Sequence, residues 1–130
     1  MNTFQSTIFS LLLLTSFGSN ASPPTRIQFA KGATGGGWSG EIKNGTKTFI
    51  LRLAKGQSLV VGGDVYTWSV IAPDGSKYGC GDNDYCYPDS DLLLLPYSGD
   101  YLVSTHYRMS DCATCPTTTT RHATIYFDLR

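Results

Sequence analysis

The chain has 130 residues, of which 41% are hydrophobic and 15% are charged, and its ten basic residues balance its ten acidic ones. This length suits one domain and is too short for two of ordinary size. A neutral chain has no general attraction for nucleic acid or for anionic membranes, so we expect neither as a partner.

The N-terminal stretch, residues 3–17, is uncharged and leucine-rich, and Ser19-Asn20-Ala21 follows it. This pattern is typical of a secretory signal peptide with a small-residue cleavage site, although no Lys or Arg precedes the apolar part. The stretch is short and serine-rich for a membrane span, which leaves a retained anchor as the alternative. We therefore predict a signal peptide over residues 1–21, a mature domain over residues 22–130, and a periplasmic or secreted location.

The mature chain is a series of short extended segments separated by turn residues. Apolar and polar alternation, with β-branched and aromatic residues, predicts strands at 26–30, 38–43, 46–54, 58–61, 66–72, 92–95, 101–107 and 122–129. Residues 31–37 are expected to form a loop because they include four glycines, and Asn44-Gly45 is a strong hairpin signal. No helical period of useful length occurs. The pattern indicates an all-β, single-domain antiparallel β-sandwich of about eight short strands.

The stretch 92–107 is the centre of the prediction. Four leucines are followed by Pro96, by the turn residues Ser98-Gly99-Asp100, and by a second apolar run that starts at Tyr101, which predicts a strand, a tight turn and a strand. Tyr101 can fold its ring into the sandwich and return its hydroxyl to the backbone, as in a tyrosine corner. The alternative is a rigid tip presented to a partner. The leucine run exposes one face unless both sides are covered, and a homodimer is one way to cover it.

Four cysteines in an exported chain indicate disulfides. Five residues separate Cys80 from Cys86, and two separate Cys112 from Cys115. Three pairings, or a zinc site of four thiolates, are open on spacing alone. We expect two local bridges, each closing a long loop and each adding about 2 kcal/mol to stability.

The remaining polar groups give weak signals for metal binding or catalysis. Asp82-Asn83-Asp84 and Asp89-Ser90-Asp91 offer oxygen ligands, but the glycine and the distal glutamate of a calcium loop are absent. We expect a solvated acidic loop there, with a calcium site as the alternative. His106 and His122 lie far apart on predicted strands, and a single glutamate, Glu41, fixes no pair of carboxylates for glycoside hydrolysis. We therefore expect no catalytic residues, no cofactor and no bound metal.

Several short motifs occur in a telling order: Phe29-Ala30-Lys31-Gly32, Ser39-Gly40-Glu41-Ile42-Lys43, Ala54-Lys55-Gly56-Gln57, Leu95-Pro96-Tyr97-Ser98-Gly99-Asp100-Tyr101, and a closing alternating strand. This order resembles the periplasmic inhibitors of g-type lysozyme, from about Ile27 to Leu129. Bacterial pre-peptidase C-terminal domains share the later motifs, and the first two motifs favour the inhibitor family. The cysteine pairs and the glycines at 35–37 are departures from the family pattern.

The resemblance implies a β-sandwich with no enzymatic activity that inhibits a lysozyme, with the g-type favoured. It implies that the partner-binding loop, Ser98, Gly99, Asp100 and Tyr101, enters the lysozyme cleft. Asp100, with Asp89 and Asp91, would suit a basic lysozyme. The alternative is a carbohydrate- or protein-binding module of the pre-peptidase type without inhibitory activity, in which Trp38, Tyr66 or Trp68 would stack on a sugar.

Overall fold

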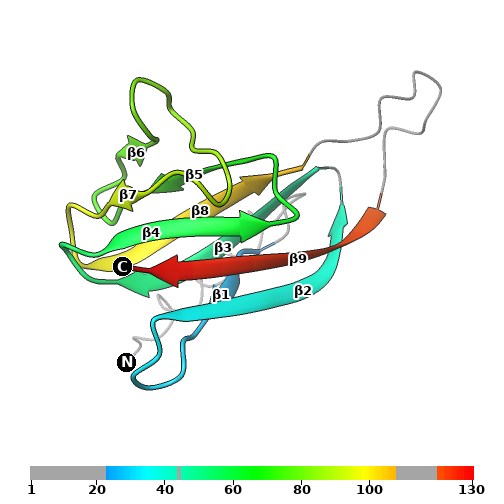
Figure 1. The fold of residues 1–130 in the computed structure, drawn as a ribbon, viewed down its shortest axis with the longest axis horizontal. Helices are drawn as coiled ribbons and strands as arrows, with labels where there is room; N and C mark the ends of the chain where they lie inside the picture. Colours follow the sequence, from blue (N-terminus) through cyan, green and yellow to red (C-terminus); the bar gives the residue numbers. More distant parts are fainter. Residues whose placement is uncertain (1–22, 44, 108–119) are drawn as a thin grey trace, which may run out of the picture.

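The computed structural model describes residues 23–43, 45–107 and 120–130, with the side chains of residues 120 and 121 left out. In these ranges the chain forms nine strands arranged as two sheets that face each other (Figure 1). No helix in the described ranges is long and apolar enough to cross a membrane. The predicted signal peptide at 1–21 lies outside the described residues.

The first sheet has five strands in the order β1-β3-β8-β5-β6. Its members are β1 (Thr25–Ile27), β3 (Thr46–Leu53), β8 (Gly99–His106), β5 (Thr67–Ile71) and β6 (Lys77–Tyr78). Neighbouring strands are antiparallel except β1 and β3, which pair in parallel at the edge.

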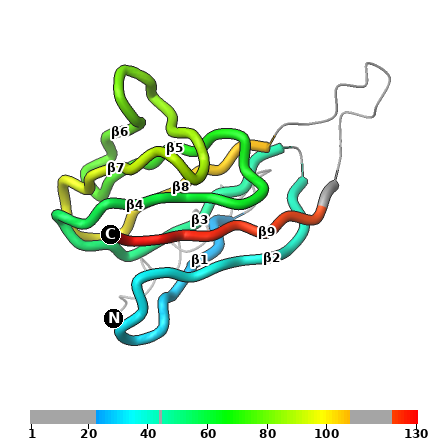
Figure 2. Tube along the Cα trace, in the orientation of Figure 1, coloured from blue at the N-terminus to red at the C-terminus, as the bar shows by residue number. Residues whose placement is uncertain are grey.

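The second sheet has four antiparallel strands in the order β2-β9-β4-β7. Its members are β2 (Gly35–Lys43), β9 (Thr120–Leu129), β4 (Ser58–Gly63) and β7 (Leu93–Leu94). The trace in Figure 2 shows β9 running between β2 and β4, although β9 follows both in the chain by a long interval.

The core lies between the sheets and follows the predicted alternation. On β3 the buried side chains are Phe49, Leu51 and Leu53, and on β9 they are Ala123, Ile125, Phe127 and Leu129. The rings of Phe49 and Phe127 meet edge to face across the layers, with centroids 5.2 Å apart. Because each sheet buries one face against the other, the predicted all-β sandwich is confirmed.

The hairpin predicted at Asn44-Gly45 is wrong. Asn44-Gly45 joins β2 to β3, yet β2 pairs with β9 while β3 pairs with β1 and β8. The segment around Pro96 likewise joins β7 of the four-stranded sheet to β8 of the five-stranded sheet. A turn signal fixes a local bend of the backbone, and each bend here carries the chain from one layer to the other.

The glycines at 35–37 form the start of β2, so the predicted loop there is also wrong. They pair with residues 126–128 of β9, whose backbone supplies the ladder of hydrogen bonds. Tertiary pairing outweighs the low strand propensity of glycine at this position.

The Cys80–Cys86 disulfide is present as predicted, with a Cα–Cα distance of 4.9 Å. Cys86 is buried beside Trp68, and the two residues exchange backbone hydrogen bonds of 2.9 and 2.6 Å. The disulfide therefore closes the β6–β7 loop on itself, and the backbone bonds of Cys86 tie that loop to β5. Cys112 and Cys115 lie outside the described residues.

The leucine run alternates as a half-exposed strand. Leu93 and Leu95 are buried, while Leu92 and Leu94 are 51% and 66% exposed. The exposed leucine face is thus confirmed, and the homodimer that would cover it stays a prediction.

Candidate functional site

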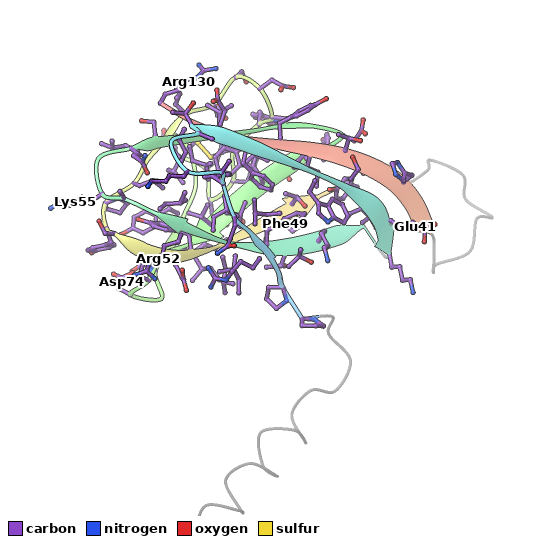
Figure 3. The ribbon with its side chains drawn as sticks, turned by 90° about the horizontal axis from the view of Figure 1, so that it is seen from below. Glu41, Phe49, Arg52, Lys55, Asp74 and Arg130 are labelled. Atoms are coloured by element: carbon purple, nitrogen blue, oxygen red, sulfur yellow. A yellow bond between two sulfur atoms is a disulfide. The ribbon has the colours of Figure 1, made fainter. Side chains whose placement is uncertain are left out.

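Residues 96–101, which lead from β7 into β8 and include the first three residues of β8, form the crossover turn. Two other turns, 54–57 and 72–76, lie against it: Gly56 donates its N–H to Leu95 O at 2.9 Å, and a Cβ built on Gly99 would lie 3.0 Å from Pro73 Cγ. In Figure 3 the labelled Arg52, Lys55 and Asp74 lie at this end of the sandwich. Three turns distant in sequence therefore make one surface.

Tyr101 holds the crossover turn from inside. Its side chain is fully buried, its hydroxyl donates to Tyr97 O at 2.6 Å, and it accepts the N–H of Tyr97 at 3.0 Å. This is the tyrosine-corner arrangement that was predicted as one alternative. Burial raises the pKa of Tyr101, because the phenolate would lose its hydration. Tyr101 thus fixes the turn while its ring contacts only the interior.

Ser98 lies exposed at the apex of the turn. Its Oγ accepts the backbone N–H of Lys55 at 2.9 Å. A serine hydroxyl has one hydrogen to donate, and this bond uses an oxygen lone pair and leaves that hydrogen available. The geometry makes Ser98 a fixed hydrogen-bond donor that faces solvent.

Gly99 has φ 141°, in a region that side chains with a Cβ rarely adopt. A Cβ there would also press on Pro73, so glycine is required by both conformation and space. The backbone path of the turn therefore depends on this residue.

Asp100 is paired with two cations. Its carboxylate accepts a hydrogen bond from Arg26 at 2.9 Å and lies 3.6 Å from Arg52. The hydrogen bond from Arg26 holds the pKa of Asp100 below its ordinary value. Since all three side chains are exposed, the pairs add little stability, but they balance the charge of Asp100.

The other two acidic residues expected near the tip are engaged elsewhere. Asp91 accepts the N–H of Tyr87 at 2.8 Å, and Asp89 lies over Gly62 of β4. With Lys55, Arg26 and Arg52 beside it, the crossover turn carries more positive than negative side chains nearby.

Tyr97, which the sequence analysis did not select, is 41% exposed on the crossover turn. A hydrogen bond with Tyr78 and the negative charge of Asp74 raise the pKa of Tyr97. Its ring is therefore held in place at the surface. The sequence could have pointed to Tyr97 as a site residue, because it stands directly before Ser98 and Gly99 of the turn.

The aromatic residues expected to stack on a sugar are mostly taken up by the core. Trp68 is fully buried and donates its Nε1–H to Tyr87 O at 3.1 Å, so that expectation is wrong for Trp68. Trp38 is half-buried, with its ring edge-to-face on Phe49 and Lys47 Nζ 5.5 Å from its centroid. Tyr66 is 48% exposed.

One group of three metal-binding residue types occurs in the described ranges, namely Cys80, Cys86 and Asp91. The two sulfur atoms are bonded to each other and are not thiolate ligands. This bridge rules out the four-thiolate zinc site considered from the sequence. The acidic residues Asp82, Asp84 and Asp89 do not join that group, so the calcium alternative gains no support from the described side chains.

Comparisons with known proteins point to one fold. No family model and no curated protein matches the chain. Among solved structures, PliG of Salmonella Typhimurium, a periplasmic lysozyme inhibitor of g-type lysozyme, superposes with a TM-score of 0.60 at 16% identity, over 85% of this chain and all of that one. PliG of Aeromonas hydrophila gives 0.59 at 20% identity over 82% and 96% of the two chains, and a PliG mutant from Escherichia coli gives 0.59 at 21% over 85% and 100%. At these identities the likeness establishes that this chain has the β-sandwich fold seen in the PliG inhibitors.

Proposed function

We propose that the protein is an exported inhibitor of lysozyme, with the g-type favoured, that inserts its crossover turn into the lysozyme cleft. Cleavage after Ala21 would release it to the periplasm or the medium. The observation that carries the proposal is an exposed Ser98 on a turn that the buried Tyr101 hydroxyl holds in place. The shared fold with three lysozyme inhibitors supports the same function.

The rigidity of the turn favours binding. A flexible loop loses conformational entropy when it enters a groove, at about 0.5–1.5 kcal/mol for each side chain that becomes ordered. Here Tyr101, the Gly99 conformation and the Lys55–Ser98 bond fix the turn before any partner arrives. Most of that entropic cost is therefore met during folding.

The chemistry of the tip matches a glycosidase cleft. Such clefts contain carboxyl groups, one of which must donate a proton to the glycosidic oxygen. The free hydrogen of the Ser98 hydroxyl can bond to that carboxyl, and Lys55 and Arg52 lie beside the turn as positive charges. Tyr97 supplies an exposed ring that can pack against the groove wall. The inhibitor would occupy the groove and perform no chemistry itself.

A turbidity assay of cell-wall lysis tests the proposal. The wild-type protein at micromolar concentration should slow lysis by g-type lysozyme more than lysis by c-type and i-type enzymes. Ser98→Ala removes one hydrogen bond to a protonated carboxyl, worth about 1 kcal/mol, and should weaken inhibition roughly fivefold. The matched control is Ser39→Ala, which removes a hydroxyl bonded to Thr124 on the four-stranded sheet and should leave inhibition unchanged.

Two results would remove the proposal. Undiminished lysis by all three lysozyme types in the presence of wild-type protein contradicts the function. Equal inhibition by the Ser98→Ala, Ser39→Ala and wild-type proteins contradicts the insertion of this turn while leaving a lysozyme partner in place.

A further inference from the structure

A shallow depression of about 440 Å³ lies on the outer face of the four-stranded sheet, apart from the crossover turn. It is lined by β2, β9 and β4 together with Asp89 from the loop before β7. Ligand sites in proteins commonly have volumes of roughly 300–1,000 Å³. The depression is thus large enough for a small ring compound, and the proposed inhibition of lysozyme does not use it.

Tyr126 stands in this depression with no bulky neighbour across either strand. It is 55% exposed on β9, the second strand of the four, and points away from the core between the buried Ile125 and Phe127. The residues opposite it are Gly37 on β2 and Gly62 on β4. Residues directly opposite share a face of the sheet, so both positions beside the ring lack side chains. No side chain of β2 or β4 at these positions covers the ring, which lies exposed as a flat apolar surface.

Asp89 occupies the space that one of these glycines provides. A Cβ on Gly62 would overlap the Asp89 carboxylate, which therefore lies directly over the β4 backbone. Asp89 has φ 67°, and its N–H donates to Val61 O at 3.0 Å, which anchors the residue to β4. The absence of a side chain at Gly62 thus places a carboxylate beside the Tyr126 platform.

A second carboxylate lies on the same outer face. Asp128 follows Tyr126 by two residues and lines the depression, and its Oδ2 accepts a hydrogen bond from Arg130 Nε at 3.0 Å. Arg130 also lines the depression and presents further N–H donors. Acceptors and donors therefore lie at the rim of an aromatic platform.

We propose that this depression binds a neutral saccharide, with one sugar ring stacked on Tyr126. The C–H face of a pyranose is apolar and packs on an aromatic ring, while its edge carries hydroxyl groups that need acceptors and donors. Asp89 and Asp128 accept hydroxyl hydrogens, and Arg130 donates to a hydroxyl or acetamido oxygen. A few polar groups around an apolar surface are the usual composition of such a site.

The same features disfavour other ligands. Two carboxylates against one arginine repel phosphates and acidic saccharides. A peptide strand cannot add to the sheet here, because β9 is already paired on both sides with β2 and β4. Neutral sugars are the class that fits both the charge and the pairing.

Titration with chitohexaose and with cellohexaose, followed by amide chemical shifts in NMR spectra, tests the inference. We expect shifts that cluster at the sheet face around Tyr126 for at least one of the two. Tyr126→Ala should weaken binding at least tenfold, whereas Tyr126→Phe, which keeps the ring, should stay within about threefold of wild type. Leu94→Ala removes an exposed apolar side chain of the same sheet that does not line the depression, and it should bind as wild type does.

Gly37→Val gives a second variant that keeps Tyr126. A Cβ at this position meets Tyr126 Cδ1 at 3.9 Å and Ile125 O at 3.4 Å, which are ordinary van der Waals contacts, and the two further methyl groups of valine extend over the side of the ring. It should weaken saccharide binding, and its melting temperature is measured alongside to show that the sheet is intact. Absence of shifts with both oligosaccharides at millimolar concentration overturns the inference, as does unchanged binding by Tyr126→Ala. Because Ser98 is not in the depression, lysozyme inhibition by these variants reports separately on the inhibitor function.

Discussion

Tyr101→Phe is the sharpest perturbation of the crossover turn, because it removes one oxygen atom and keeps the buried ring. The lost hydroxyl donates to Tyr97 O and accepts from Tyr97 N, at 2.6 and 3.0 Å. No other side chain is removed. The variant therefore separates the bonds that hold the turn from the packing that holds the core.

The expected cost follows from these two hydrogen bonds. Each contributes about 1 kcal/mol net, so the free energy of unfolding should fall by about 2 kcal/mol. Water reaches the exposed Tyr97 and limits the further cost of leaving its backbone groups unpaired. For a domain of this size, that loss lowers the melting temperature by roughly 10 °C. The freed turn should also inhibit lysozyme several-fold less well at a temperature where the variant is fully folded.

Urea denaturation gives the stability and the turbidity assay gives the inhibition. The control is Val103→Ala, which shortens a fully buried side chain on the same strand and lowers stability by a similar amount, about 2 kcal/mol, while leaving the Tyr101 hydroxyl in place. Val103→Ala should inhibit as well as wild type. A Tyr101→Phe stability within about 0.5 kcal/mol of wild type would refute the hydrogen-bonding argument. Equal loss of inhibition by both variants would refute the link between turn rigidity and binding.

Two further predictions concern stability. Replacing Cys80 and Cys86 by alanine together opens a loop whose ends are six residues apart, and the free energy of unfolding should fall by about 2 kcal/mol in urea titrations, so an unchanged midpoint and slope would contradict it. Because Arg26 lowers the folded-state pKa of Asp100, the unfolded chain binds the proton first as the pH falls below about 4, and the stabilisation from this pair is lost in that range. The difference in melting temperature between wild type and Asp100→Asn should therefore shrink between about pH 6 and pH 2, and a difference that stays constant or grows would show that the pair does not stabilise the fold.

The strands of the sandwich were predictable because a strand with one buried face alternates apolar and polar residues along the sequence. Phe49, Leu51 and Leu53 occupy alternate positions of the strand predicted at 46–54 and face inward, and Ile125 and Phe127 do the same in the strand predicted at 122–129. The alternation does not reveal which strands pair with each other. Asn44-Gly45 and Ser98-Gly99 are turn sequences in either case, and whether a turn stays within a sheet or changes layers depends on partners far away in the chain.

The candidate site shows the same division. The tyrosine corner was predictable because Tyr101 and Tyr97 are four residues apart and the contact is local. Asp100 and Arg26 are 74 residues apart in the chain, so no local sequence pattern predicts that they pair. The platform at Tyr126 requires Gly37 and Gly62 on two different strands, so it becomes visible only once the register is known.

The placement of β9 also bears on how the protein reaches its native state. Ser39 and Thr124, which share a hydrogen bond across β2 and β9, are 85 residues apart. Strand β9 pairs with both β2 and β4, so neither of those strands has its main partner until residues 120–129 have been synthesised. Folds dominated by such distant pairings form in milliseconds to seconds, far more slowly than helical bundles. The nascent chain consequently lacks its second sheet throughout most of its synthesis. In that state the chain is still extended enough to be threaded through a membrane channel.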